Sequence, residues 1–240
     1  MPSVLVINPN TSVSVTGMVV DACRAACPGV VWEGVTGRIG APYIASEVAY
    51  ALAGHAALDA FAQHVGNHDA VLIACFGDPG LLAVREVSPV PVIGLAEASF
   101  MAAATQGRFA VVTGGHAWGP MLERFARMHR LDTGLTGIFT VDLTGAQIAQ
   151  APERALADLR QACEKAVASG AECIVLGGAA LTGLADRLQP HVSVKLLDNV
   201  VLGAQAAVER VKAVATRQTG VPRASQSLTG VSTPLAGLLA

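Results

Sequence analysis

Short apolar runs rich in Val and Ile recur along this chain, and longer Ala-rich segments of helical period separate them. The runs are 4–7, 30–35, 70–74, 92–95, 109–113, 137–141, 173–176 and 194–197. Strands that alternate with helices predict βαβ units and parallel sheets. Eight predicted strands fit either one closed (β/α)₈ barrel or two four-stranded sheets.

An internal repeat favours two sheets. VLIACFGDPGL, residues 71–81, aligns with IVLGGAALTGL, residues 174–184, at an offset of 103 that places Cys75 over Gly178. The same offset pairs two further strand segments, 6–8 with 109–111 and 91–94 with 194–197. We therefore expect an α/β fold of two pseudo-symmetric lobes, each built on a four-stranded parallel sheet.

The lobes can be assigned residue ranges. The first lobe is expected at 1–95 plus 200–216, because the last helix crosses back to it, and the second lobe at 96–199. Open α/β sheets bind ligands outside the carboxyl ends of their strands, so two facing lobes predict an active site in one shared cleft. The tail, 217–240, is rich in Ser, Thr, Gly and Pro. That composition favours mobility, unless Leu235, Leu238 and Leu239 dock on a neighbouring surface.

Composition and motifs exclude several classes of function. The chain is 52% hydrophobic and 14% charged with a net charge of −2, and it has no basic stripe, so we expect no nucleic-acid partner. No apolar run reaches the roughly 18 residues of a membrane span, and the N-terminus lacks the basic flank of a signal peptide. The five cysteines are odd in number and include no C-x-x-C pair, and a cytoplasmic protein is expected, so disulfides are not. No His, Asp or Glu cluster has metal-ligand spacing, so no metal is expected. The absence of a G-x-S-x-G motif and of a phosphate loop argues against hydrolases and kinases.

Cys75 is the residue best placed for chemistry. It stands where a buried strand ends and the turn FGDPG, residues 76–80, leads into a helix. Backbone N–H groups at a helix start stabilise a thiolate, so we expect a lowered pKa for Cys75. Such a thiol can give or take a proton, and a buried structural cysteine is the competing interpretation.

Polar residues at other strand ends are candidates for binding a substrate. Asn8 and Thr11 follow the first strand, where they either cap the next helix or donate hydrogen bonds to a carbonyl or carboxylate. Tyr43 follows the second strand. Thr113 and Gly114 end the fifth strand, in a loop of small residues that can form an anion nest.

The motifs INPNT (7–11), ACFGDPGL (74–81) and PVIGLAEAS (91–99) carry a resemblance. With them, the sequence over residues 3–213 resembles the hydantoin racemase family of the aspartate/glutamate racemase superfamily. The resemblance implies two flavodoxin-like lobes related by a pseudo-twofold axis. It also implies a homo-oligomeric enzyme that uses no cofactor, with hydantoins, allantoin or amino acids as small-molecule carbonyl or carboxylate substrates.

The family's mechanism uses two cysteines, one from each lobe, on opposite faces of a carbon acid. The first corresponds to Cys75. The second falls on Gly178, and Cys173 lies five residues earlier, about 16 Å away along an extended strand. The resemblance thus implies proton transfer at Cys75 and a vacant partner position at Gly178. The residues expected to hold the substrate are Asn8, Thr11, Tyr43, Phe76, Gly77, Thr113, Gly114 and Ala179.

Four interpretations follow from the missing thiol. In the first, the chain is a racemase in which Gly178 is a natural or engineered loss, and Gly178→Cys raises turnover by orders of magnitude. In the second, it is a single-cysteine decarboxylase of the arylmalonate type with Cys75 as proton donor, although that enzyme keeps its thiol in the second lobe. In the third, it only binds its ligand. In the fourth, His116 or a water is the second proton carrier.

Overall fold

The computed structural model describes the chain except at residues 65, 145–146, 149–150, 214–226 and 239–240. Its strands are β1 (Ser3–Asn8), β2 (Val31–Thr36), β3 (Ala70–Ile73), β4 (Val92–Gly94), β5 (Phe109–Gly114), β6 (Leu135–Val141), β7 (Cys173–Gly177) and β8 (Lys195–Asp198). Its α-helices are α1 (Val13–Ala26), α2 (Glu47–His64), α3 (Leu81–Val87), α4 (Leu95–Ala104), α5 (Trp118–Met128), α7 (Pro152–Ala168), α8 (Leu184–Leu188), α9 (Asn199–Ala213) and α10 (Thr233–Gly237). Short 3₁₀ turns lie at Ala179–Leu181 and Gln189–His191.

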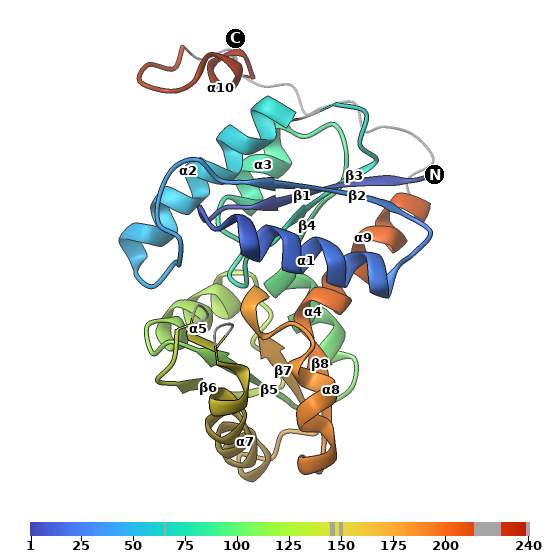
Figure 1. Ribbon diagram of the computed structural model, residues 1–240, viewed down its shortest axis with the longest axis vertical. Helices are drawn as coiled ribbons and strands as arrows, with labels where there is room; N and C mark the ends of the chain where they lie inside the picture. Colours follow the sequence, from blue (N-terminus) through green and yellow to red (C-terminus); the bar gives the residue numbers. More distant parts are fainter. Residues whose placement is uncertain (65, 145–146, 149–150, 214–226, 239–240) are drawn as a thin grey trace.

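The strands form two four-stranded sheets with the same connectivity. Their orders are β2-β1-β3-β4 and β6-β5-β7-β8, and every neighbouring pair is parallel. Figure 1 shows one lobe above the other, with α1, α4 and α9 between the two sheets. The predicted α/β fold of two lobes with one four-stranded parallel sheet each is confirmed, and the barrel alternative is wrong.

Strand residues alternate between buried layers, which explains why the strands read as unbroken apolar runs. On β1, Val4 and Val6 belong to a central cluster that continues through α4 to Phe109 and Val111 of the second sheet. Neighbouring β1 residues instead join the cluster beneath α2 and α3. A third cluster packs the far face of the second sheet against α7. The central cluster therefore joins the lobes into one core.

The internal repeat holds at the turns that follow β3 and β7. Gly80 and Gly183 precede α3 and α8 with φ of 81° and 80°, so the predicted offset of 103 fits this part of the chain. Because the left-handed conformation costs an L-residue steric strain, glycine suits both positions. Cys75 and Gly178 accordingly occupy corresponding places in the two lobes.

The offset is wrong for the first strands of the two sheets. Ile7 pairs with Ile73 in the first sheet, whereas Val112 pairs with Leu176 in the second. Ile7 therefore corresponds to Val112, an offset of 105, and the predicted alignment of 6–8 with 109–111 slips by two residues. The reason is that the segments joining the paired strands differ in length, which identity along one strand cannot reveal.

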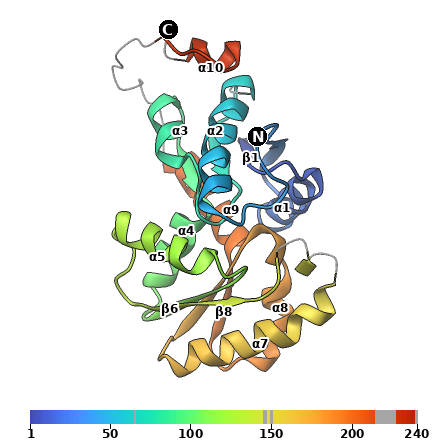
Figure 2. The ribbon, with the colours of Figure 1, turned by 90° about the vertical axis from the view of Figure 1, so that its left-hand side faces the viewer.

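The last two helices pack against earlier parts of the chain. Helix α9 packs against α1, α4 and β3, and α10 packs against α2. Figure 2 shows α10 and α7 at opposite ends of the molecule. Leu235 is buried and Leu238 packs on the cluster beneath α2 and α3, while Leu239 lies outside the described residues. In the described part of the chain, no helix combines the length and apolarity that a membrane crossing requires.

Candidate active site

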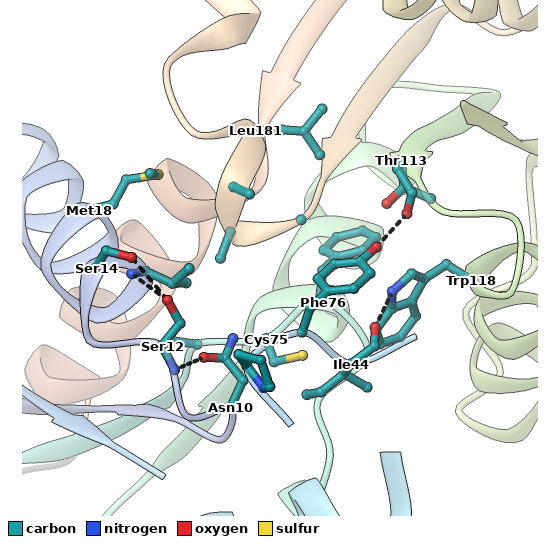
Figure 3. Close-up of a pocket in the computed structure, with 18 residues that line it drawn as sticks. Asn10, Ser12, Ser14, Met18, Ile44, Cys75, Phe76, Thr113, Trp118 and Leu181 are labelled. Atoms are coloured by element: carbon teal, nitrogen blue, oxygen red, sulfur yellow. Dashed lines mark hydrogen bonds between the residues drawn. The ribbon is translucent and has the colours of Figure 1, made fainter. Parts of the chain in front are cut away.

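A cavity of about 300 Å³ lies between the lobes, at the carboxyl ends of the strands. The first lobe lines it with residues that follow β1, β2 and β3, and the second lobe with residues at the ends of β5 and β7. In the view of Figure 3, Ser12 and Ser14 lie to one side of Cys75, with Thr113 and Trp118 to the other. The position agrees with the general rule that open parallel sheets bind ligands beyond their strand ends.

Cys75 and Gly178 both line this cavity, and Cys75 is the one cysteine among the lining residues. Cys75 as a residue is 8% exposed. Burial, followed by the negative charge of Asp78, raises the pKa of Cys75 well above its ordinary value. The predicted lowering of this pKa is therefore wrong. Helix α3 begins only at Leu81, so its N–H groups are too far along the chain to offset burial.

The turn after Cys75 is fixed by contacts on both sides. Gly77 has a φ of 136°, and a Cβ there would lie 2.5 Å from Cζ3 of Trp118. The Tyr50 hydroxyl donates a hydrogen bond of 2.7 Å to the Gly77 carbonyl. Phe76 packs directly over Gly177 of the second lobe. Only glycine satisfies the space and the φ at residue 77, and the thiol is held in place as a result.

Asp78 ties the same turn to α4. Its buried carboxylate accepts hydrogen bonds from the N–H groups of Ala96 and Glu97, at 2.9 and 2.8 Å. Burial raises the pKa of Asp78 to about 7, although the two N–H donors oppose this rise. A carboxylate near a strand end can begin its own helix, but Asp78 instead caps the helix that lies between the lobes.

Three of the predicted substrate-binding residues, Asn8, Thr11 and Gly77, lie outside the cavity lining. Asn8 is fully buried, and its amide donates to Asn10 Oδ1 at 2.8 Å and to Ser12 O and Thr16 Oγ1 at 3.0 Å. The backbone N–H of Thr11 donates to Ala41 O at 3.1 Å. Asn8 therefore shapes the β1–α1 loop instead of facing the cavity.

The β1–α1 loop presents other polar groups. Asn10, Ser12 and Ser14 line the cavity, and sequence reasoning missed all three. Ser12 is the N-cap of α1, and its hydroxyl accepts from Val15 N at 3.5 Å. The pattern Asn-Thr-Ser at residues 10–12 is typical of a helix N-cap and could have indicated them. The first residues of α1 line the cavity, so the side chains of its capping loop lie there too.

A loop of the first lobe reaches across to the second. The Tyr43 hydroxyl donates to Gly114 O at 3.2 Å, and Trp118 Nε1 donates to Ile44 O at 3.0 Å. Tyr43, Ile44, Gly114 and Trp118 all line the cavity. The sequence predicted Tyr43 and Gly114 at this site, but Trp118 was missed. Trp118 is one of two tryptophans in the chain and follows a strand-end loop, which could have indicated it. These two bonds close one side of the cavity.

The second-lobe wall is formed by Thr113, Gly178 and Ala179. Gly178 has a φ of 124°, and a Cβ there would lie 3.8 Å from Thr113 Oγ1. Cys173 begins β7, where its buried Sγ lies 3.7 Å from Ala103 O, away from the cavity lining. His116 is outside the lining too, with its ring at 2.9 Å from Thr140 Oγ1.

Among the residues that the structure describes, no group of three His, Cys, Asp or Glu side chains has an arrangement that could hold a metal ion. The side chains around the cavity are hydroxyls, one amide, one thiol, one indole and apolar groups. Such a set can hold carbonyl oxygens and exchange a proton at a carbon beside them.

The sequence matches the family model described as Asp/Glu/Hydantoin racemase over residues 4–207. The chain belongs to the Asp/Glu/hydantoin racemase family. Family membership confirms the resemblance carried by INPNT, ACFGDPGL and PVIGLAEAS. The hydantoin racemase of Pseudomonas sp. (strain NS671) is 32% identical over 206 residues, which cover 84% of this chain and 83% of that protein.

Solved structures agree with this member's fold. Allantoin racemase from Klebsiella pneumoniae is 28% identical, with a TM-score of 0.89 over 99% of both chains. A variant of arylmalonate decarboxylase in a liganded form is 15% identical, with a TM-score of 0.66 over 92% of this chain and 97% of that one. At that identity, the second likeness concerns the fold alone.

Proposed function

We propose that this family member moves a proton at the carbon next to a carbonyl in a hydantoin-type ring, with Cys75 as the proton-transfer group. The observation that carries the proposal is the position of Cys75 in the inter-lobe cavity. The hydantoin racemase and allantoin racemase among its relatives support the substrate class. A hydrogen beside a carbonyl is weakly acidic, so a positioned thiol can accelerate its transfer.

The cavity suits a ring with polar edges and an apolar substituent. Asn10, Ser12 and Ser14 offer hydrogen-bonding groups at one end. Val15 and Met18 add apolar surface nearby. Carbonyl oxygens that gain charge in the transition state are stabilised by donors already in place. A substituted hydantoin fits because it carries two carbonyls and one side chain at the reacting carbon.

The raised pKa of Cys75 sets the expected pH dependence. Proton removal needs the thiolate, and burial keeps the thiol protonated near neutral pH. The rate of proton removal should therefore rise as the pH increases through the alkaline range. Proton delivery needs the thiol, so a reaction that only delivers a proton should lose rate over the same range.

The raised pKa of Cys75 also supports a second candidate function, decarboxylation. Loss of CO₂ from a substituted malonate leaves a carbanion that needs one protonated donor on one face, and a thiol with a raised pKa supplies it. We infer that Cys75 would act as this donor. Release of CO₂ from substituted malonates, lost in Cys75→Ser, would separate this reaction from racemisation.

Hydrogen exchange in D₂O tests the proposal most directly. NMR would follow the hydrogen on the reacting carbon of single-enantiomer 5-substituted hydantoins, allantoin and amino acids, and chiral chromatography would follow inversion. We expect exchange with the natural chain and a loss of at least 100-fold in Cys75→Ser, in line with the usual contribution of an acid–base group of about 10²–10⁴. Ligand binding without exchange or CO₂ release would instead indicate a binding protein.

A further inference from the structure

Leu181 occupies the part of the cavity that faces the missing thiol. It ends the 3₁₀ turn Ala179–Leu181, and its N–H donates to Gly178 O at 3.0 Å. Its side chain is 2% exposed, belongs to the buried cluster of the second lobe and lines the cavity. Figure 3 shows Leu181 across the cavity from Cys75.

A side chain at position 178 would meet Leu181 before any other residue. A Cβ built there would lie 2.8 Å from Leu181 Cδ1, closer than real Cβ contacts. The φ of 124° disfavours any L-residue independently of space. Leu181 is packed within the second-lobe cluster. If its Cδ1 methyl group had to move away from a side chain at position 178, it would therefore move into the cavity. The second proton-transfer position is thus closed by a hydrocarbon side chain.

We propose that Leu181 determines from which face the substrate exchanges its proton. The inference rests on the proposed function of Cys75. On the Cys75 face, the C–H bond breaks as the thiolate sulfur takes the proton and the electron pair moves to the carbonyl oxygen. The S–H group exchanges with solvent and returns a proton to the same carbon. The opposite face meets a methyl group that carries no transferable proton, so exchange occurs with retention.

The proposal predicts that Gly178→Cys alone is a poor restoration of racemisation. The introduced cysteine must displace the side chain of Leu181 and adopt the positive φ of position 178. Combining Gly178→Cys with Leu181→Ala removes the first obstacle. The matched control is Gly178→Ala with Leu181→Ala, which carries the same backbone strain and the same space but no sulfur.

Two readouts test these variants. The first is alkylation of the thiol introduced at position 178 by iodoacetamide, mapped by peptide mass, which needs no turnover. We expect it to be at least tenfold faster in the double variant than in Gly178→Cys alone. The second is the ratio of inversion to deuterium exchange, which should rise at least tenfold over the single variant and exceed the ratio of the control, whose opened wall admits solvent but carries no thiol.

Leu181→Ala in the natural background avoids the strain at Gly178. Opening the wall should let solvent deliver protons from the second face, so its inversion-to-exchange ratio should exceed that of the natural chain. Equal alkylation and inversion in Gly178→Cys with and without Leu181→Ala would overturn the proposal, as would an unchanged ratio in Leu181→Ala. Absence of exchange in the natural chain would refute the role of Cys75, and with it the role of Leu181 in exchange, while the alkylation comparison would still show whether Leu181 closes position 178.

Discussion

At the scale of single residues, Asp78 controls both the place and the acidity of Cys75. Its carboxylate caps α4, and its charge is the second contribution, after burial, to the raised pKa of the thiol. Asp78 itself has a pKa of about 7, so it is charged throughout the range in which the thiol ionises. Asp78 therefore holds the turn that positions Cys75, and its charge also raises the pKa of the thiol.

Asp78→Asn should lower the pKa of Cys75, because it removes a like charge while keeping the shape of the side chain. We expect the pH midpoint of Cys75 alkylation by iodoacetamide to fall by about one unit. Peptide mass mapping would follow the modification across pH. Asp142→Asn, which alters an almost fully exposed carboxylate, is the control. An unchanged midpoint in Asp78→Asn would show that burial alone sets the acidity.

At the scale of elements, sequence patterns predict the strands better than the segments between them. Apolar runs such as 109–113 lie within strands because both faces of each sheet are covered, which leaves a continuous hydrophobic signal. The sequence holds no comparable pattern for which loop side chains face the cavity. The INPNT motif indicated a site loop, but which of its side chains faces the cavity depends on the Asn8 amide turning inward to Asn10, Ser12 and Thr16.

The tail shows the same division between composition and packing. Composition favours mobility, yet Ser232 Oγ donates to Asp59 Oδ1 at 2.5 Å, and Arg38 and Gln63 also bind this carboxylate. Burial alone would raise the pKa of Asp59, but these hydrogen bonds outweigh it and hold the pKa below its usual value. The stabilisation is therefore present above the unfolded pKa of about 3.9 and is lost as the pH falls through the lower folded value.

Ser232→Ala should loosen α10 at neutral pH. The change removes the N-cap of α10 and the contact with Asp59, at a cost of about 1 kcal/mol, which corresponds to about a fivefold larger open population. Amide hydrogen exchange of residues 235–238 would measure it. Ser227→Ala, at an exposed tail position, should leave those amides unchanged. Equal protection in Ser232→Ala and the natural chain would contradict the assigned role of this contact.

At the scale of the whole molecule, the cleft between the lobes follows from the repeat, but its closure does not. Corresponding strand ends bring Cys75 and Gly178 to one cavity, and the aligned motifs were sufficient to predict that. The crossing contacts of Tyr43 and Trp118 join segments more than 70 residues apart and depend on backbone carbonyls, which leave no trace in side-chain pattern.

Trp118→Phe tests whether closure of the cleft supports binding. It leaves the Ile44 carbonyl without its indole donor, so the free energy of unfolding should fall by about 1–3 kcal/mol, measured in urea. Trp32→Phe is a matched control, since Trp32 Nε1 donates to Cys27 O at 3.2 Å and does not line the cavity. Both variants should lose stability, but only Trp118→Phe should raise the KM for hydantoin exchange, because only there does the bond hold a cavity wall. An equal rise in KM in both variants would mean that general destabilisation, and not closure, governs binding.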